Sequence, residues 1–239
     1  MIARLVWYGF LALIGVCTAA LQLDRQSATM PAIASLTPEP VRSFAQAQIV
    51  AQKLQNGDPA RALDEAKILV NRRPIPAETL RLLAQAQFAA NAQTDGFVTI
   101  QIAARRGWRD TVAQESMLRL AVAAGDEAEA AKRYVALLLK NETSNALLQE
   151  IGAELFADAE SPASTTLAQI VTDANRWRTT FVRRGARVLP PATFAKVIAA
   201  SMDAGTSFDC QTLSRSAAVI ANRDSEAASR LKGLIQSSC

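Results

Sequence analysis

Two short stretches decide the fold: GDPARAL at residues 57–63 and GDEAEAA at residues 125–131. The separation of their Gly-Asp pairs is twice the period of about 34 residues that one class of helical repeat has. Asp58 followed by Pro59 is a helix start signal, because aspartate caps free N–H groups and proline needs no N–H at the first helical position. Gly125 follows ESMLRLAVAA and is typical of a residue just past a helix end. The sequence therefore predicts helices joined by tight turns, repeated at this period.

Other positions agree with a repeat unit whose fifteenth residue is Gly57, Asn91 or Gly125. Small residues, and the large residues beside them, fall where the two helices of such a unit cross: Ala62, Leu83, Ala84, Ala103, Ala130, Tyr134, Ile151 and Gly152, with Pro74 near the end of the first unit. This pattern resembles the tetratricopeptide repeat (TPR) family over residues 43–170. The chain departs from it at Gly96 and Ser164, where the family has alanine, and it lacks the family's usual tryptophan.

The resemblance implies an all-α fold, a TPR-like right-handed solenoid of helix–turn–helix units over residues 41–172. One hairpin cannot bury its own apolar face, so the units must stack and the ends of the stack must be capped. The repeat register is lost after residue 172. We expect residues 173–239 to form further helices that cap the C-terminal end.

TPR units commonly bind extended peptides on a concave face. The repeat register predicts which residues of this chain would form that face. The residues so placed include Glu78, Arg81, Gln85, Phe88, Glu115, Arg119 and Gln149. The family's carboxylate clamp of paired lysine and asparagine is not reproduced, so a chaperone tail is not the expected ligand. Arg81 and Arg119 can each bind a carboxylate. The alternative is that these residues form ordinary solvated helix surfaces.

The N-terminal stretch LVWYGFLALIGVCTAALQL, residues 5–23, contains no charged residue. As a helix, its 19 residues span roughly 28 Å, close to the thickness of a membrane's hydrocarbon core. Arg4 precedes it, so the positive-inside rule places the rest of the chain outside the cytoplasm. We therefore expect a transmembrane anchor over residues 1–23 in a bacterial inner membrane, with a periplasmic soluble part.

Other interpretations of the N-terminus stay open. The stretch is a cleaved signal peptide if Thr18-Ala19-Ala20 or Ala32-Ile33-Ala34 is a cleavage site, in which case the protein is secreted to the periplasm. Lipidation would use Cys17, although Val16 before it is large for that motif. Residues 24–40, with Pro31, Pro38 and Pro40, predict a flexible linker rather than a strand or helix.

The composition disfavours enzymatic chemistry. The chain of 239 residues has no histidine, which excludes Ser-His-Asp and Cys-His nucleophilic sites and histidine-ligated zinc. It has no Gly-rich phosphate loop and no metal-ligand spacing, so we expect no enzyme, cofactor or metal. A net charge of +4 is too small to demand nucleic acid.

A basic stretch and a cysteine pair are further candidates. Five arginines with no acidic residue between them lie at Arg176, Arg178, Arg183, Arg184 and Arg187, interleaved with Trp177 and Phe181. They could engage phosphate, acidic glycan or lipid headgroups; the alternative is an amphipathic helix whose apolar side enters the core. Cys210 and Cys239 could form a disulfide in an oxidising compartment, or stay free thiols.

Three functions follow as hypotheses. The first is a membrane-tethered scaffold or adaptor that docks an unidentified protein partner at the bacterial cell envelope, with envelope polysaccharide assembly as a pathway suggested by analogy. The second is a module that binds acidic glycan or anionic lipid through residues 176–187. The third is a structural subunit of a larger complex.

Overall fold

The computed structural model describes residues 2–239, except for the side chain at position 238, and these residues are all-helical. They form thirteen α-helices and two short 3-10 helices, and no strand occurs among them. The chain divides into two compact units, residues 1–107 and 108–239. The division therefore falls inside the region predicted as continuous repeats and not at residue 172.

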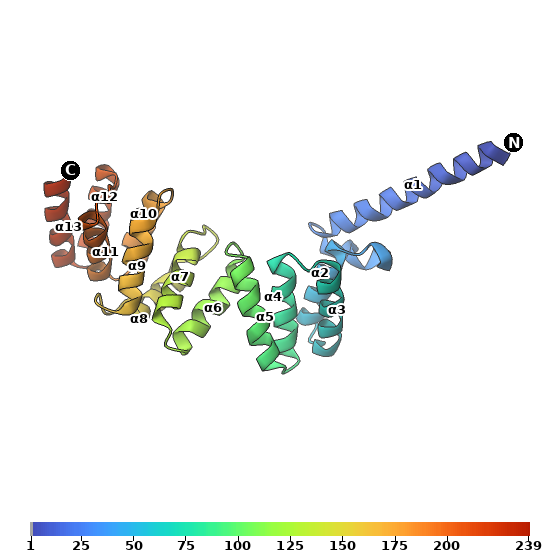
Figure 1. Ribbon diagram of the computed structural model, residues 1–239, viewed down its shortest axis with the longest axis horizontal. Coiled ribbons are helices and arrows are strands. Elements are labelled where there is room, and N and C mark those ends of the chain that lie inside the picture. Colours follow the sequence, from blue (N-terminus) through green and yellow to red (C-terminus); the bar gives the residue numbers. More distant parts are fainter. Residues whose placement is uncertain (1) are drawn as a thin grey trace. The chain divides into compact units, whose positions relative to one another are not determined.

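The first unit holds an N-terminal helix followed by two helical hairpins (Figure 1). Its elements are α1 (Ile2–Ser27), the 3-10 helices η1 (Pro31–Leu36) and η2 (Glu39–Val41), α2 (Phe44–Gln55), α3 (Pro59–Arg72), α4 (Ala77–Ala89) and α5 (Gln93–Arg106). Ala47, Ala62, Ala66 and Ala86 are buried between α2, α3 and α4. These small side chains let the helix backbones approach closely.

The second unit continues with hairpins to the C-terminus. Its helices are α6 (Thr111–Ala123), α7 (Glu127–Leu138), α8 (Asn145–Leu155), α9 (Pro162–Asp173), α10 (Arg178–Val188), α11 (Pro191–Asp203), α12 (Cys210–Ala221) and α13 (Ser225–Ser238). Helix α9 packs on α7 and α11, and α10 packs on α8 and α12. One hydrophobic core runs from Leu118 to Leu231. The predicted C-terminal cap thus shares its core with the helices before it.

The turns at Gly57, Asn91 and Gly125 are alike, and they are evenly spaced along the sequence. All three residues have positive φ, from 61° to 69°. At each turn, the N–H of the next residue donates to the carbonyl five positions earlier, as in the bond from Asp58 to Lys53 at 3.0 Å. Asn91 takes this left-handed conformation although it is not glycine, a tolerance that asparagine has more than most residues. The spacing of the Gly-Asp pairs therefore corresponds to equivalent turns.

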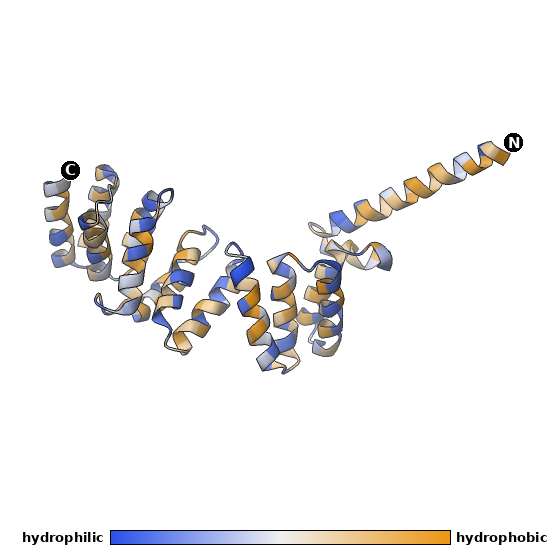
Figure 2. Cartoon of the chain, viewed as in Figure 1, coloured by the Kyte–Doolittle hydropathy of each residue, from blue (hydrophilic) through white to orange (hydrophobic). Residues whose placement is uncertain are grey.

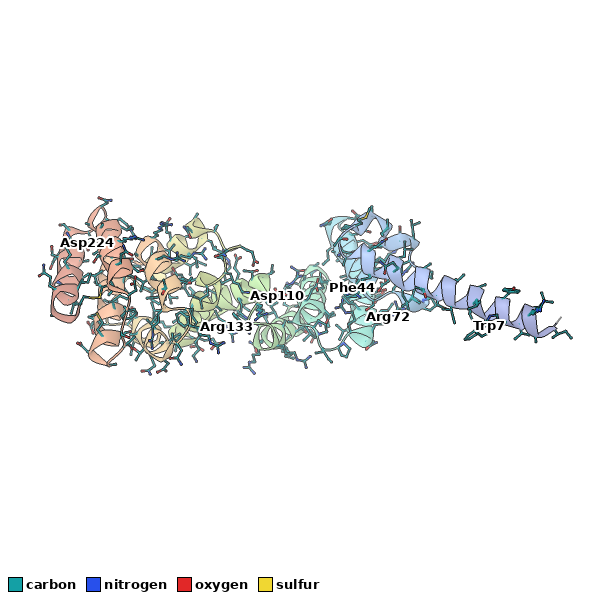
Figure 3. The ribbon with its side chains drawn as sticks, turned by 90° about the horizontal axis from the view of Figure 1, so that it is seen from above. Trp7, Phe44, Arg72, Asp110, Arg133 and Asp224 are labelled. Carbon is teal, nitrogen blue, oxygen red and sulfur yellow. A yellow bond between two sulfur atoms is a disulfide. The ribbon has the colours of Figure 1, made fainter. Side chains whose placement is uncertain are left out.

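Helix α1 extends beyond the predicted apolar stretch at both ends. It is long and apolar enough to cross a membrane, judged by length and composition alone, and its apolar window is not buried against the rest of the chain. Figure 2 shows mostly apolar residues along its length, and Trp7 projects outward from it in Figure 3. A signal sequence passes the same test.

The prediction of a flexible linker over residues 24–40 was wrong. Residues 24–27 complete α1, and most of the remainder forms η1 and η2, which pack against α1 and α2. The buried Asp24 carboxylate accepts hydrogen bonds from the backbone N–H groups of Ser43, Phe44 and Ala45. The prolines, which indicated a linker, instead begin the short 3-10 helices.

Candidate functional site

A groove lies between α2 and α4 in the first unit. Its volume is about 580 Å³. The residues that line it are Ala47, Gln48, Ala51, Leu54, Gln55, Glu78, Arg81, Leu82 and Gln85. We call it the α2–α4 groove. The structure thus brings together three of the predicted binding residues, Glu78, Arg81 and Gln85.

The α2–α4 groove combines apolar and polar walls. Ala47, Ala51, Leu54 and Leu82 contribute aliphatic surface, while α4 supplies a carboxylate, a guanidinium and an amide. Within α4, Arg81 Nη1 donates to Gln85 Oε1 at 3.1 Å, which fixes the two side chains relative to each other. Such a surface suits an extended peptide with small apolar side chains next to polar ones.

Phe88, the fourth of the predicted binding residues on α4, does not line the α2–α4 groove. Phe88 packs edge-to-face against Phe97 of α5, with ring centroids 5.3 Å apart. A Cβ atom on Gly96 would lie 2.7 Å from the Phe88 ring. The ring therefore occupies the space that an alanine side chain at position 96 would need.

The remaining predicted binding residues make contacts inside the second unit. Arg119 Nη2 lies 2.9 Å from Glu115 Oε1, one turn away on α6. Exposed pairs of this kind contribute about 0.3–0.5 kcal/mol. Gln149 Nε2 donates to the carbonyl of Arg187 at 3.0 Å and so joins α8 to α10. None of these three residues lines the α2–α4 groove.

The five arginines of the basic stretch do not form one patch. Arg178 Nη2 donates to the Thr172 carbonyl at 3.1 Å, near the end of α9. Arg176 precedes α10 and is exposed. Arg183, Arg184 and Arg187 line a second cavity of about 500 Å³. The amphipathic alternative also holds for α10, because Phe181, Val182 and Ala186 are buried on its other side.

Arg184 organises the loop between α7 and α8. Its Nη1 donates to the carbonyls of Leu138, at 2.8 Å, and Lys140, its Nη2 donates to that of Thr143, and its Nε donates to Asn145 Oδ1 at 3.0 Å. Burial lowers the pKa of this guanidinium. The sequence predicts Arg184 as one member of a basic patch and misses this structural role, because carbonyls so much earlier in the chain leave no local signal.

The structure joins Cys210 and Cys239 in a disulfide, with their Cα atoms 6.0 Å apart. The bond links the start of α12 to the C-terminal residue. Cys17, on α1, is a free thiol. Within residues 2–239 no three His, Cys, Asp or Glu residues lie close enough together to hold a metal ion.

Comparisons with known proteins supply no relative for this chain. No family model matches it, and neither a curated protein nor a solved structure matches it. The TPR resemblance therefore rests on the repeat positions alone.

Proposed function

We propose that this protein is a membrane-tethered docking protein built from degenerate TPR-like hairpins. Two observations support the repeat assignment. The turns at Gly57, Asn91 and Gly125 share one conformation. Helices α2, α4, α6 and α8 begin at nearly equal intervals along the chain, at Phe44, Ala77, Thr111 and Asn145. Hairpins of this kind present surfaces to partners rather than reaction centres.

In this proposal α1 is a single-pass anchor that leaves the hairpins in the periplasm. Its uncovered apolar surface supports a membrane location, since a soluble protein rarely exposes so large an apolar patch. Arg4 before the apolar stretch supports the orientation. A disulfide between Cys210 and Cys239 suits an oxidising compartment.

The α2–α4 groove is the observation on which the docking function rests. Asp24, near the end of α1, caps α2, so the groove begins close to where the chain leaves the bilayer. The expected occupant is therefore an extended segment that adjoins the membrane in a partner anchored in the same bilayer. Small side chains of that segment would face Ala47 and Ala51, and a basic residue would face Glu78.

Site-specific photo-crosslinking from the groove tests this function. A photoreactive amino acid replaces Gln48 in the full chain, produced in its own membrane, and the matched control carries it at the exposed Gln101 of α5. We expect position 48 to crosslink one membrane partner, within a single juxtamembrane segment. A synthetic peptide of that segment should compete, and Glu78→Lys should reduce the yield.

Two results would count against groove docking. The first is an absence of adducts from position 48. The second is an equal set of adducts from positions 48 and 101, which is expected of a structural subunit enclosed in a larger complex.

A further inference from the structure

The second unit contains a cavity lined by polar residues alone. The residues are Asn141, Thr143, Ser144, Asn145, Thr180, Arg183, Arg184 and Arg187. We call it the arginine pocket. No carboxylate lines it, although Glu142 is exposed in the same loop. Three guanidinium groups around about 500 Å³ without a neutralising acid attract a compact, highly charged anion.

One wall of the arginine pocket is a face of α10. Thr180, Arg183, Arg184 and Arg187 follow one another at intervals of three, one and three residues, so they share one side of the helix. The opposite side is fixed in the core by buried apolar residues such as Phe181. Helix α10 therefore cannot rotate to carry its arginines away from the cavity.

The other wall is the loop that Arg184 holds in place. Because Arg184 already donates to three backbone carbonyls and to Asn145, it serves as a positioning residue. The guanidinium groups of Arg183 and Arg187, by contrast, make no hydrogen bond or ion pair with any residue in the described part of the chain. These two groups are thus available to a ligand.

The loop wall adds hydrogen-bond donors. Ser144 caps α8, and the backbone N–H of Asn145 lies in the first turn of that helix, where the helix dipole favours negative charge. Thr143, 6% exposed, lines the cavity, and its hydroxyl has no hydrogen-bond partner within residues 2–239. A buried hydroxyl without a partner is uncommon in folded proteins.

From this arrangement we propose that the arginine pocket binds a phosphate group carried on a hydrophilic molecule, with Arg183 and Arg187 as its ligands. Guanidinium groups bind phosphate oxygens through paired, charge-assisted hydrogen bonds. The lining offers no large apolar side chain for an acyl tail or a hydrophobic ring. The phosphate is therefore that of a soluble sugar phosphate or of a lipid headgroup whose tails stay outside the cavity.

The test uses the full chain in phosphatidylcholine nanodiscs. Glucose 1-phosphate is titrated by calorimetry at low salt, and anionic vesicles containing phosphatidylglycerol are offered separately in a sedimentation assay. The test variant is Arg183→Gln/Arg187→Gln. The matched control, Arg176→Gln/Arg215→Gln, removes the same charge at two exposed arginines outside the pocket.

We expect saturable binding of one probe, weakened at least about tenfold in the test variant and left within about twofold in the control. Saturation by glucose 1-phosphate identifies a soluble phosphate as the source, and binding to the vesicles alone identifies a lipid headgroup. Absence of binding to both probes would overturn the proposal, as would an equal loss in the two variants or no loss in the test variant.

Discussion

Asp24 Oδ1 accepts a 2.9 Å hydrogen bond from the backbone N–H of Ala45, in the first turn of α2. The same carboxylate accepts from the N–H groups of Ser43 at 2.8 Å and Phe44 at 3.2 Å. Ser43, the residue at the N-cap, makes no side-chain capping bond of its own. A side chain of α1 therefore caps the first hairpin helix and ties the apolar helix to the first hairpin.

Asp24→Ala should loosen the start of α2. Loss of a capping carboxylate costs about 0.5–2 kcal/mol, and here buried N–H groups lose their acceptor. Hydrogen exchange of the full chain in micelles should therefore become about tenfold faster over residues 43–50. Asp64→Ala, at an exposed position of α3, is the control and should leave that exchange unchanged. Unchanged exchange in Asp24→Ala would show that the cap contributes nothing.

The disulfide should stabilise the C-terminal hairpin. Cys210 and Cys239 are 29 residues apart. Closing a loop of that length contributes about 3–4 kcal/mol in the chain-entropy description. We expect Cys239→Ser to lower the denaturation midpoint of the second unit, as reductant does for the unsubstituted chain. Reductant should have no effect on Cys239→Ser itself, and a midpoint that is insensitive to reductant in the unsubstituted chain would contradict the pairing.

Gly152→Ala should destabilise the second unit. An added Cβ would lie 2.7 Å from the Tyr134 hydroxyl oxygen, which is buried and donates to the Leu148 carbonyl at 2.9 Å. Overpacking of this kind costs about 1–3 kcal/mol. Gly233→Ala, on an exposed part of α13 with nothing within 4 Å of the new atom, should be neutral or stabilising. Thermal unfolding of both variants measures their stabilities. Equal unfolding temperatures for Gly152→Ala and Gly233→Ala would refute the predicted overpacking at Gly152.

Stability should fall at alkaline pH through Tyr134. Burial raises the pKa of its hydroxyl well above the ordinary value, although Arg184 and Arg223 oppose the shift. The unfolded chain thus loses this proton from about pH 10 while the folded chain retains it, so this stabilising contribution is complete below pH 10 and declines above it. Tyr134→Phe should remove this part of the decline in denaturant titrations between about pH 9 and 11. The only other tyrosine, Tyr8, lies on α1. An unchanged decline of stability in Tyr134→Phe would exclude Tyr134 as its cause.

The sequence predicted the helices of the hairpins well because their signals are local. Asp58 and Asp126 cap the helices that follow them, and Ser161 caps α9 before Pro162. These side chains accept from backbone N–H groups three residues later, so their effect can be seen in a short stretch of sequence. The equivalence of the turns at residues 57 and 125 follows from the same kind of signal.

The sequence could not show contacts made over long separations. In the sequence, Asp24 looks like a charged residue that merely flanks the apolar stretch. In the structure it accepts hydrogen bonds from the start of α2. In the sequence, Arg184 looks like a solvated cation. In the structure it donates to carbonyls of the loop after α7. Phe88 fits the binding-face register, yet the missing side chain at Gly96 lets its ring pack against Phe97 of α5. The roles of Asp24 and Arg184 depend on partners that are distant in sequence. The position of the Phe88 ring depends on the absence of a side chain at Gly96.

The most direct test of an anchored docking protein is its membrane topology. In a Cys17→Ser chain, whose remaining cysteines are joined by the disulfide, single cysteines are introduced by Ile2→Cys before the apolar stretch and by Arg61→Cys at an exposed site on α3. A membrane-impermeant maleimide is then applied to intact spheroplasts. For an anchored periplasmic protein we expect labelling at position 61 at once, labelling at position 2 only after lysis, and one full-length chain that resists alkaline extraction. Protection of position 61, or a mature chain that has lost its N-terminal residues and is released as a soluble protein, would contradict it.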